Sequence, residues 1–340
     1  MGNPKVTVLM PVFNDEKYLK QSIASILNQT FRDFEFLIIE DASTDKSAEL
    51  IKTFKDRRIK VLINKKNLGI SSSLNKGLKI AKGEYIARMD ADDISLPRRL
   101  EKQVKFMDRN PDVGICGSWV KLFGKGKGVL KYPSDSKQLK VDLLFFDTIM
   151  HPTVILRKKM FQKFNLRYNA KNRCLEDYEL FAAASRYFPL SNIKEVLLRH
   201  RAHSLQACRL QRDAQMIEAQ IIQLKQLRHL GLEPTRQELD IHNSKMGSNL
   251  RIDLNFIQKA ERWFCKILYA NRKKRIYDKK ILLSAMGNTW LVMCRQLPRR
   301  DLSLKVIDTF LDSPLSKGID LKAKAKFVAS VLKRLRTKPF

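Results

Sequence analysis

Four short apolar runs near the N-terminus constrain the fold of this 340-residue chain more than any other feature. Each is long enough for a buried strand, and each is followed by a segment with helical spacing of apolar residues. The runs are Val6–Val12, Phe34–Ile39, Ile59–Ile63 and Tyr85–Met89, and the helical segments are Glu16–Leu27, Asp45–Phe54, Ser71–Ala81 and Pro97–Met107. This alternation predicts an α/β domain in which helices cover both faces of a parallel sheet.

The predicted secondary structure of the rest of the chain falls into two parts. Up to about residue 210 the pattern is mixed, with strands expected at Val113–Val120, Thr153–Leu156 and Ile193–Leu198 and helices at Lys158–Phe164 and Tyr178–Tyr187. Five helical segments follow, at Asp213–Leu230, Asp253–Asn271, Lys279–Arg295, Leu302–Leu311 and Asp320–Leu335. We therefore predict two domains, an α/β domain over residues 1–210 and a mainly helical, basic domain over residues 211–340.

The chain is strongly basic, with 66 Lys and Arg against 35 Asp and Glu and a net charge of +31. Nucleic acid, an anionic membrane surface and a polyanionic substrate are the partners that such a charge favours. A nucleic-acid- or polyanion-binding protein is therefore one alternative function. Nucleic acid is the less favoured partner, because the basic residues are spread along the chain without aromatic stacking platforms or a recognisable binding motif.

The cysteines and the hydropathy predict a compartment. Five cysteines without a close pair give neither a zinc spacing nor a disulfide framework, which fits a reducing environment. No secretory signal opens the chain, and no run reaches the ~18 apolar residues of a spanning helix. Residues 320–337 are predicted to form a helix with leucines and valines along one side and many lysines and arginines elsewhere. We expect a cytoplasmic protein whose last helix either packs on its domain or lies on the inner face of an anionic membrane.

Polar residues follow three of the apolar runs. Asp90 and Asp92 come directly after the fourth run, Asp41 follows the second, and Asn14 follows the first. Ligands bind at the carboxyl ends of parallel strands, so these side chains are expected at one edge of the sheet. Two carboxylates at this spacing suit Mg²⁺ or Mn²⁺, although an acidic turn without a metal is the alternative.

The first turn, Pro11-Val12-Phe13-Asn14, offers backbone that can line a base pocket, or it is an ordinary strand-to-helix turn. Pro11 is expected to end the hydrogen bonding of its strand. No Gly-x-Gly-x-x-Gly and no P-loop follows, which counts against dinucleotide and P-loop sites. A nucleotidyltransferase would use the same acidic pair, but it would want a basic, Gly-rich loop here, and none is present.

Four segments together carry a resemblance. Pro11-Val12-Phe13-Asn14, Glu40-Asp41-Ala42-Ser43-Thr44-Asp45, Asn67-Leu68-Gly69 and Met89-Asp90-Ala91-Asp92-Asp93 occur in the order and spacing of the family 2 glycosyltransferases. The chain resembles that family over about the first 205 residues. The resemblance implies a GT-A fold, a Rossmann-like nucleotide-binding domain, a nucleoside-diphosphate sugar donor and inversion at the anomeric carbon.

The resemblance also implies roles for single residues. Asp41 is similar to the carboxylate that contacts the base, usually uracil, and the segments of Pro11, Phe13, Asn14 and Asn67 belong to the nucleotide site. Asp92 corresponds to the direct metal ligand, and Asp90 to the residue that contacts ribose or a metal-bound water. In the Glu176-Asp177 motif the aspartate corresponds to the general base. Diphosphate or acceptor contacts are implied for His151, Glu176 and Arg201, and a metal contact for His203.

The chain departs from the family pattern at two places. Ala42 stands where Gly is commoner, so we expect a turn that does not use a positive φ. The Gln-x-x-Arg-Trp segment of processive synthases is missing, which favours transfer of a single sugar. The acceptor is expected to be a glycan or a lipid-linked glycan, in the synthesis of cell-surface polysaccharide or lipopolysaccharide by analogy.

The chemistry explains the need for these groups. A divalent ion stabilises the charge that grows on the departing diphosphate, and the acceptor hydroxyl needs a carboxylate base. The start of a helix favours the anionic form of Asp177 and so lowers its basicity, which burial must offset. Plain helix capping is the alternative role for Glu176 and Asp177.

Overall fold

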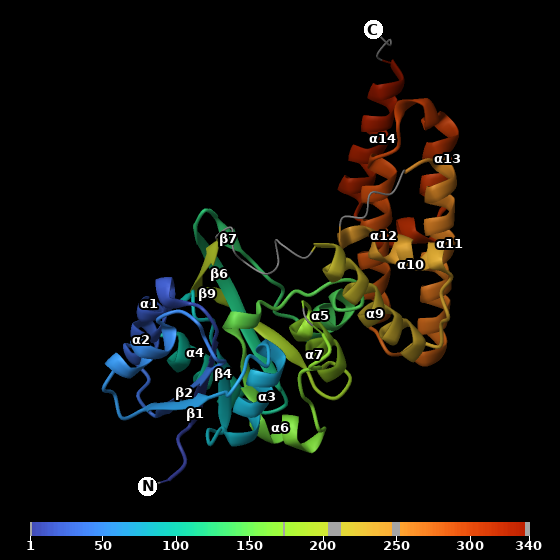
Figure 1. Cartoon of the computed structure of the whole chain (residues 1–340). Helices are drawn as coiled ribbons and strands as arrows, with labels where there is room; N and C mark the ends of the chain where they lie inside the picture. The colour runs from blue at the N-terminus through green and yellow to red at the C-terminus, as the bar shows by residue number, and fades with distance from the viewer. Residues whose placement is uncertain (1, 173, 203–211, 247–251, 337–340) are drawn as a thin grey trace. The chain divides into compact units, whose positions relative to one another are not determined.

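The computed structural model describes residues 2–172, 174–202, 212–246 and 252–336 (Figure 1). The chain divides into two compact units. The first comprises Met1–Leu139 and Asp147–Glu218, and the second Lys140–Phe146 and Ala219–Phe340. This division differs from the predicted boundary at residue 210 in two ways. The units change between Glu218 and Ala219, and Lys140–Phe146, from the middle of the chain, belong to the second unit. The domain boundaries stay a prediction.

The first unit is built on one nine-stranded sheet. Its strands are β1 (Val6–Val12), β2 (Phe34–Glu40), β3 (Ile59–Ile63), β4 (Tyr85–Arg88), β5 (Ile94–Ser95), β6 (Ile115–Gly124), β7 (Val129–Leu130), β8 (Ile155–Arg157) and β9 (Leu190–Ala202). They lie in the order β3-β2-β1-β4-β8-β6-β9-β5, with β7 paired to β6. The pairs β3/β2, β2/β1 and β1/β4 are parallel, as predicted.

Beyond β4 the sheet is mixed, which differs from the parallel sheet expected. β8 runs antiparallel to both β4 and β6, whereas β6 and β9 are parallel. The short apolar segments that form β8 and β6 carry no signal of their direction, because direction depends on the connections between them. The observed β9 is much longer than the predicted strand Ile193–Leu198.

Helices pack on this sheet through their apolar sides. They are α1 (Glu16–Leu27), α2 (Ser47–Thr53), α3 (Ile70–Ile80), α4 (Arg99–Arg109), α6 (Lys158–Lys163) and α7 (Glu176–Ala184). A further helix, α5 (Ser136–Asp142), begins in the first unit, and its last residues belong to the second. In α1, for example, Leu19, Ile23 and Ile26 share one face by helical spacing and are buried. They pack with β1 side chains such as Val8 and Met10, and this core holds the strand ends in place.

The second unit is helical. It contains most of α9 (Arg212–His229), α10 (Arg236–His242), α11 (Leu254–Lys274), α12 (Lys279–Arg295), α13 (Leu304–Asp312) and α14 (Leu321–Arg336). Side-chain caps begin three of these helices: Thr235 forms a capping box with Glu238, and Asp253 and Asp278 accept hydrogen bonds from the first turns of α11 and α12.

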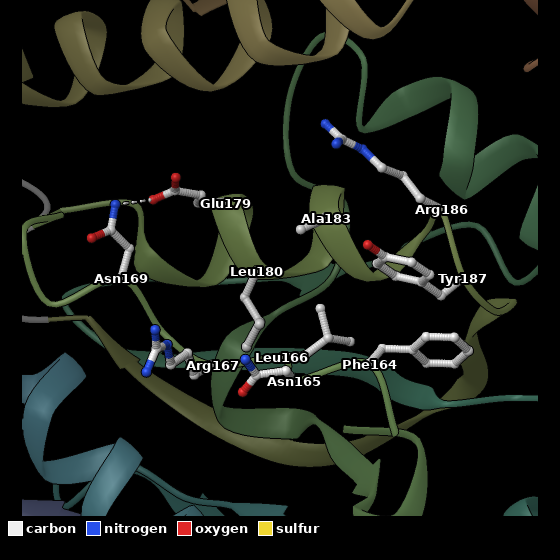
Figure 2. A pocket seen from close by; sticks show the side chains of 10 residues that line it. All are labelled: Phe164, Asn165, Leu166, Arg167, Asn169, Glu179, Leu180, Ala183, Arg186 and Tyr187. Atoms are coloured by element: carbon white, nitrogen blue, oxygen red, sulfur yellow. Dashed lines mark hydrogen bonds between the residues drawn. The ribbon is translucent and has the colours of Figure 1, made fainter. Parts of the chain in front are cut away.

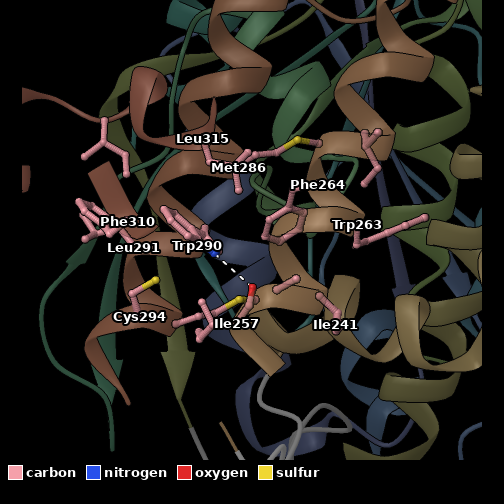
Figure 3. Close-up of a cluster of buried hydrophobic side chains, with 14 of the residues drawn as sticks. Ile241, Ile257, Trp263, Phe264, Met286, Trp290, Leu291, Cys294, Phe310 and Leu315 are labelled. Atoms are coloured by element: carbon pink, nitrogen blue, oxygen red, sulfur yellow. Dashed lines mark hydrogen bonds between the residues drawn. The ribbon is translucent and has the colours of Figure 1, made fainter. Parts of the chain in front are cut away.

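Aromatic side chains fill the core of the second unit (Figure 3). Trp290 and Phe310 stack with their ring centroids 5.2 Å apart, and Phe310 lies 4.2 Å from Phe327 of α14. The Trp290 indole N–H donates to the Ile257 carbonyl at 3.4 Å. No helix in the described parts of the chain is long and apolar enough to cross a membrane.

The last helix is tied to this core by its apolar side. Phe327 and Val331 are buried, and Val328 and Leu332 pack against the same cluster. Most of the apolar stripe seen in the sequence of residues 320–337 is therefore occupied within the unit. Leu321 at the start of α14 is 82% exposed, and the lysines and arginines of the helix face outward or lie half-buried.

Candidate active site

The predicted site residues after β1, β2 and β4 lie at the ends of neighbouring strands. Because the order is β2-β1-β4 and these strands are parallel, their carboxyl ends meet at one edge of the sheet. The pairing of β1 with β4 stops at Leu9, while its pairing with β2 continues to Val12. The expectation that Pro11 ends its strand is wrong, because beyond Leu9 the strand is paired on one side only and tolerates a residue without an N–H.

The loops after β1 and β2 are joined by side-chain hydrogen bonds. Asn14 Oδ1 accepts from the Thr44 N–H at 2.8 Å, and the Asn14 N–H donates to Ser43 Oγ at 3.1 Å. The Asp15 N–H donates to Ser47 Oγ at 2.9 Å. Asn14 thus holds the two loops together, and Phe13 beside it is exposed at the edge of the sheet.

The turn at Ala42 contradicts the sequence prediction. Ala42 has φ +59°, in the left-handed region that an L-residue enters at a cost. The Glu40 carboxylate accepts from the N–H groups of Ala42 at 3.2 Å and Ser43 at 2.6 Å. These bonds, made by a buried carboxylate, hold the positive φ without a glycine.

Asp41 is buried and its carboxylate is bound to the loop after β3. Its Oδ1 accepts from Asn64 Nδ2 at 2.6 Å and from the Leu68 N–H at 3.0 Å, and its Oδ2 accepts from the Gly69 N–H at 2.9 Å. Asn67 is exposed in the same loop and also accepts from the Gly69 N–H. Asp41 therefore positions the loop that carries Asn67. The motif alone did not identify Asn64, although it is an amide directly after a strand.

Three carboxylates follow β4. Asp90, Asp92 and Asp93 each have one carboxylate oxygen that lies within 4.8 Å of the corresponding oxygens of the other two. Oxygen donors at this spacing fit Mg²⁺ or Mn²⁺. Burial raises the pKa of the nearby Asp15 to about 7, and the charges of Asp92 and Asp90 add to the rise. The residues present therefore fit a divalent cation, which would relieve this accumulation of negative charge.

Asp93 also links this loop to the end of β9. It is fully buried, and its carboxylate lies 3.0 Å from His200 Nδ1 and accepts from the Arg201 N–H at 2.8 Å. The Arg201 Nε donates to the Asp92 carbonyl at 2.8 Å, and its guanidinium lies against the rings of Tyr18 and Phe123. The structure thus brings Arg201 to the acidic loop. His203, predicted as a metal contact, lies outside the described residues.

A second group of titratable residues gathers at the start of α7. His151 Nδ1 lies 3.6 Å from Glu176 Oε1 and 3.7 Å from Asp177 Oδ2, while His151 Nε2 is 2.9 Å from the Tyr168 hydroxyl. The N-cap residue is Leu175, which makes no side-chain cap, and the Asp177 carboxylate accepts from the adjacent Tyr178 N–H at 2.8 Å. The three predicted residues His151, Glu176 and Asp177 are therefore neighbours.

Burial sets the protonation of this group. It raises the pKa of Glu176 to about 7, and the charge of Asp177 adds to this rise. It also raises the pKa of Asp177, against the opposing hydrogen bond from Tyr178 and the charge of Arg88. Burial and the charge of Arg88 hold the pKa of His151 well below its usual range, so its ring is neutral. The start of a helix lowers the pKa of Asp177, and burial raises it, as we expected from the sequence.

Arg88 joins the two groups. It is buried at the end of β4, and both terminal guanidinium nitrogens contact the Asp90 carboxylate. Its charge also acts on Glu176 and Asp177, whose pKa values it lowers. We did not single out Arg88 from the sequence, although a charged residue inside an otherwise apolar buried strand is an available signal.

Asp147 is a further residue that the sequence analysis missed. Its Oδ1 accepts from the Ile149 N–H at 2.8 Å, and burial together with the charge of Asp177 raises its pKa well above the usual range. It therefore belongs with the group at the start of α7. Nothing in the local sequence separates it from the other polar residues between Gly124 and His151.

Known proteins share this chain's sequence and fold. The family model Glycosyl transferase family 2 matches residues 7–164. An uncharacterised glycosyltransferase of Methanocaldococcus jannaschii is 40% identical over 210 residues, covering 59% of this chain and 72% of the relative. The O-antigen biosynthesis glycosyltransferase WbnJ of Escherichia coli is 35% identical over 207 residues, covering 58% of this chain and 80% of the relative.

Two solved structures extend the likeness to most of the chain. S. aureus TarS in complex with UDP-GlcNAc has a TM-score of 0.58 and 17% identity, covering 98% of this chain and 91% of that one. The mannosyltransferase PcManGT from Pyrobaculum calidifontis, in complex with GDP-Man and Mn²⁺, has a TM-score of 0.52 and 15% identity, covering 99% and 88%. At these identities the likeness shows the fold, and it confirms the predicted α/β architecture with a helical C-terminal region.

Proposed function

The chain belongs to glycosyl transferase family 2, and from this premise we propose that it moves a single sugar from a nucleoside-diphosphate sugar, a UDP-sugar, to a hydroxyl of a glycan or lipid-linked glycan with inversion. Membership of the family makes the chain a glycosyltransferase, as predicted. It also favours sugar transfer over the alternatives of a nucleotidyltransferase and a nucleic-acid-binding protein.

The observation that carries the proposal is the position of Arg88. Its guanidinium contacts Asp90, and its charge also acts on Glu176 and Asp177. The carboxylates suited to a donor's metal and the carboxylates suited to a base are thus held around one buried cation. Inverting transfer needs both groups in one site, because the base removes the acceptor's proton while the metal stabilises the leaving diphosphate.

On the donor side, Asp90 and Asp92 would hold Mn²⁺ or Mg²⁺, with His203 as a further predicted contact. When bound, the ion would supply positive charge for the leaving diphosphate. Asp41, Asn14 and the exposed Phe13 line the adjoining edge of the sheet, where we place the nucleotide together with Pro11 and Asn67. The Mn²⁺ and nucleotide sugars bound by PcManGT and TarS support this assignment.

On the acceptor side, Asp177 takes the proton of the acceptor hydroxyl. The hydroxyl oxygen forms the new bond to the anomeric carbon as the bond from that carbon to the β-phosphate oxygen breaks. The raised pKa of Asp177 makes it a better base than an exposed aspartate. His151 lies beside the carboxylates of Glu176 and Asp177 and is held by the Tyr168 hydroxyl. Because its ring is neutral, His151 adds no positive charge that would lower the pKa of the base.

We assign the reaction to the synthesis of cell-surface polysaccharide or lipopolysaccharide, which the name of the E. coli relative supports. We also propose that the protein works in the cytoplasm, peripherally on the inner face of the membrane. Because the apolar side of α14 is packed in its own unit, membrane contact would rest on its lysines and arginines. Binding to anionic vesicles should then disappear at high salt, whereas salt-resistant binding would contradict this mode.

Donor hydrolysis tests the function without knowledge of the acceptor. The protein is incubated with a panel of nucleotide sugars and Mn²⁺, and nucleoside diphosphate release is followed. We expect release from a UDP-sugar that is lost with chelator and reduced at least about 100-fold in Asp92→Asn. Asp112→Asn, a change at an exposed turn, is the matched control and should behave as the parent. Release that ignores chelator and Asp92→Asn would overturn the proposed donor site.

A further inference from the structure

A hollow of about 310 Å³ lies beside α7, apart from the carboxylates of the candidate active site (Figure 2). Figure 2 shows Asn169, Glu179 and Arg167 toward one end and Phe164, Tyr187 and Arg186 toward the other. Nothing in the proposed transfer reaction uses these side chains. Their chemistry nevertheless resembles that of a site for a sugar.

The aromatic end offers a flat, accessible ring. Tyr187 is 52% exposed, and it stacks on Phe164 with ring centroids 4.5 Å apart and an interplanar angle of 20°. The stacked partner fixes the tyrosine ring without covering it completely. A rigid exposed aromatic ring with a hydroxyl at its tip suits the apolar face of a pyranose, which also carries hydroxyl groups at its rim.

The polar lining carries an excess of positive charge. Glu179 supplies the negative charge of the lining, and its Oε2 already accepts from Asn169 Nδ2 at 2.9 Å. Arg167 and Arg186 are exposed and form no ion pair with the described parts of the chain. Outside the lining, Lys163 lies next to the aromatic end, with its Nζ 5.3 Å from the centre of the Phe164 ring. Guanidinium groups suit carboxylate and phosphate, so the lining favours an anionic saccharide.

The hollow is placed on the helix that carries the proposed base. Glu176, Glu179 and Ala183 follow each other at i, i+3 and i+7, so they share one face of α7. At 1.5 Å per residue, Ala183 lies about 9 Å along the helix axis from Asp177. Asp177 follows Glu176 by one residue and therefore lies about 100° around α7 from this face. An acceptor that extends from Asp177 to the hollow has to pass around the helix as well as along it.

We propose that the hollow binds the acceptor beyond the reacting hydroxyl, and that the acceptor carries a carboxylate or phosphate group there. This inference rests on the proposed function, since it takes Asp177 as the base. The transfer chemistry does not explain the positive charge of the chain. In this proposal, the positive charge near the hollow serves to recognise a polyanionic substrate.

Binding of defined saccharides to the full chain tests this site. The probes are a galacturonic acid tetrasaccharide, a neutral galactose tetrasaccharide and inorganic phosphate, measured by calorimetry. We expect the uronate to bind about tenfold more tightly than the neutral saccharide, and the double variant Arg167→Gln/Arg186→Gln to remove that difference. Tyr187→Ala should weaken both saccharides by about fivefold.

Matched variants control for charge and for exposed tyrosine. Arg57→Gln/Arg109→Gln removes two exposed arginines elsewhere, and Tyr269→Ala removes another exposed ring. Neither should change saccharide binding. Equal binding of the two saccharides, or an equal loss in the control variants, would overturn the proposed site. Phosphate that displaces the uronate while Tyr187→Ala has no effect would show an anion site without sugar recognition, which also overturns it.

Donor hydrolysis separates this inference from the proposed function. The Arg167/Arg186 and Tyr187 variants should hydrolyse the donor at the parent rate, because none of these residues lies among the donor carboxylates. Parent hydrolysis without uronate binding overturns the acceptor site alone. Uronate binding without any donor hydrolysis by the parent protein overturns the proposed function.

Discussion

Replacement of Arg88 by methionine tests the link between the two halves of the candidate site. The Arg88 side chain is 4% exposed and that of its partner Asp90 is 26% exposed. Removing one member of a buried ion pair costs about 3–5 kcal/mol, and because a quarter of the Asp90 side chain reaches solvent we expect about 3 kcal/mol. Arg88 Nε has no hydrogen-bond partner, so the substitution loses nothing at that atom.

The same change should move the pH dependence of donor hydrolysis and transfer. Arg88 lowers the pKa values of Glu176 and Asp177, so without it both carboxylates hold their protons to higher pH. A base works when deprotonated, and the acidic limb of the rate profile for transfer should therefore shift to higher pH.

Urea unfolding in the presence of chelator measures the first effect, because no added cation can then replace the guanidinium beside Asp90. Arg88→Lys keeps the charge but not the two-pronged contact, and it should fall between the parent and Arg88→Met. Arg109→Met, at an exposed position, is the control. If Arg88→Met unfolds within about 0.5 kcal/mol of the parent and leaves the acidic limb unmoved, Arg88 does not join the two groups.

Three further predictions follow from single contacts. Ala42→Gly should raise the free energy of unfolding by about 0.5–1 kcal/mol, since glycine adopts φ +59° without a steric cost; a lower melting temperature would contradict this. Gly83→Ala should destabilise by about 3 kcal/mol, because its Cβ would lie 2.3 Å from the Thr7 backbone nitrogen, whereas Gly2→Ala has free space around it and should be neutral in the same denaturation assay. Glu176→Gln should move the acidic limb of transfer to lower pH, because Asp177 loses a negative neighbour; rates from pH 5 to 9 that keep the parent limb would refute the coupling.

The parallel part of the fold follows from the sequence because its signals are local. The apolar runs that predict β1, β2, β3 and β4 need only to be buried, and their alternation with helices requires parallel pairing. The sequence does not reveal the antiparallel pairing of β8 with β4, which depends on how a long connection returns to the sheet. The sequence also does not reveal that residues 140–146 belong to the second unit, where Val141, Leu144 and Phe145 are buried in the core.

The candidate site shows a similar division. Asp41, Asp90, Asp92 and Asp177 are visible in the sequence because carboxylates follow apolar runs or match a motif, although their roles stay predictions. Arg88 and Asp147 were missed, because their importance comes from neighbours that are distant in sequence. The turn at Ala42 was predicted wrongly because the supporting Glu40 carboxylate was not considered.

The configuration of the released sugar tests the central claim most directly. Donor hydrolysis by the parent protein is followed by proton NMR in the first minutes, before the free sugar interconverts between its anomers. We predict that an α-linked UDP-sugar releases the β-anomer first. Asp177→Asn should slow this release because the base is lost, while the variant still binds UDP in the presence of Mn²⁺. Initial release of the α-anomer, or an unchanged rate in Asp177→Asn, would contradict inversion by a base at the start of α7.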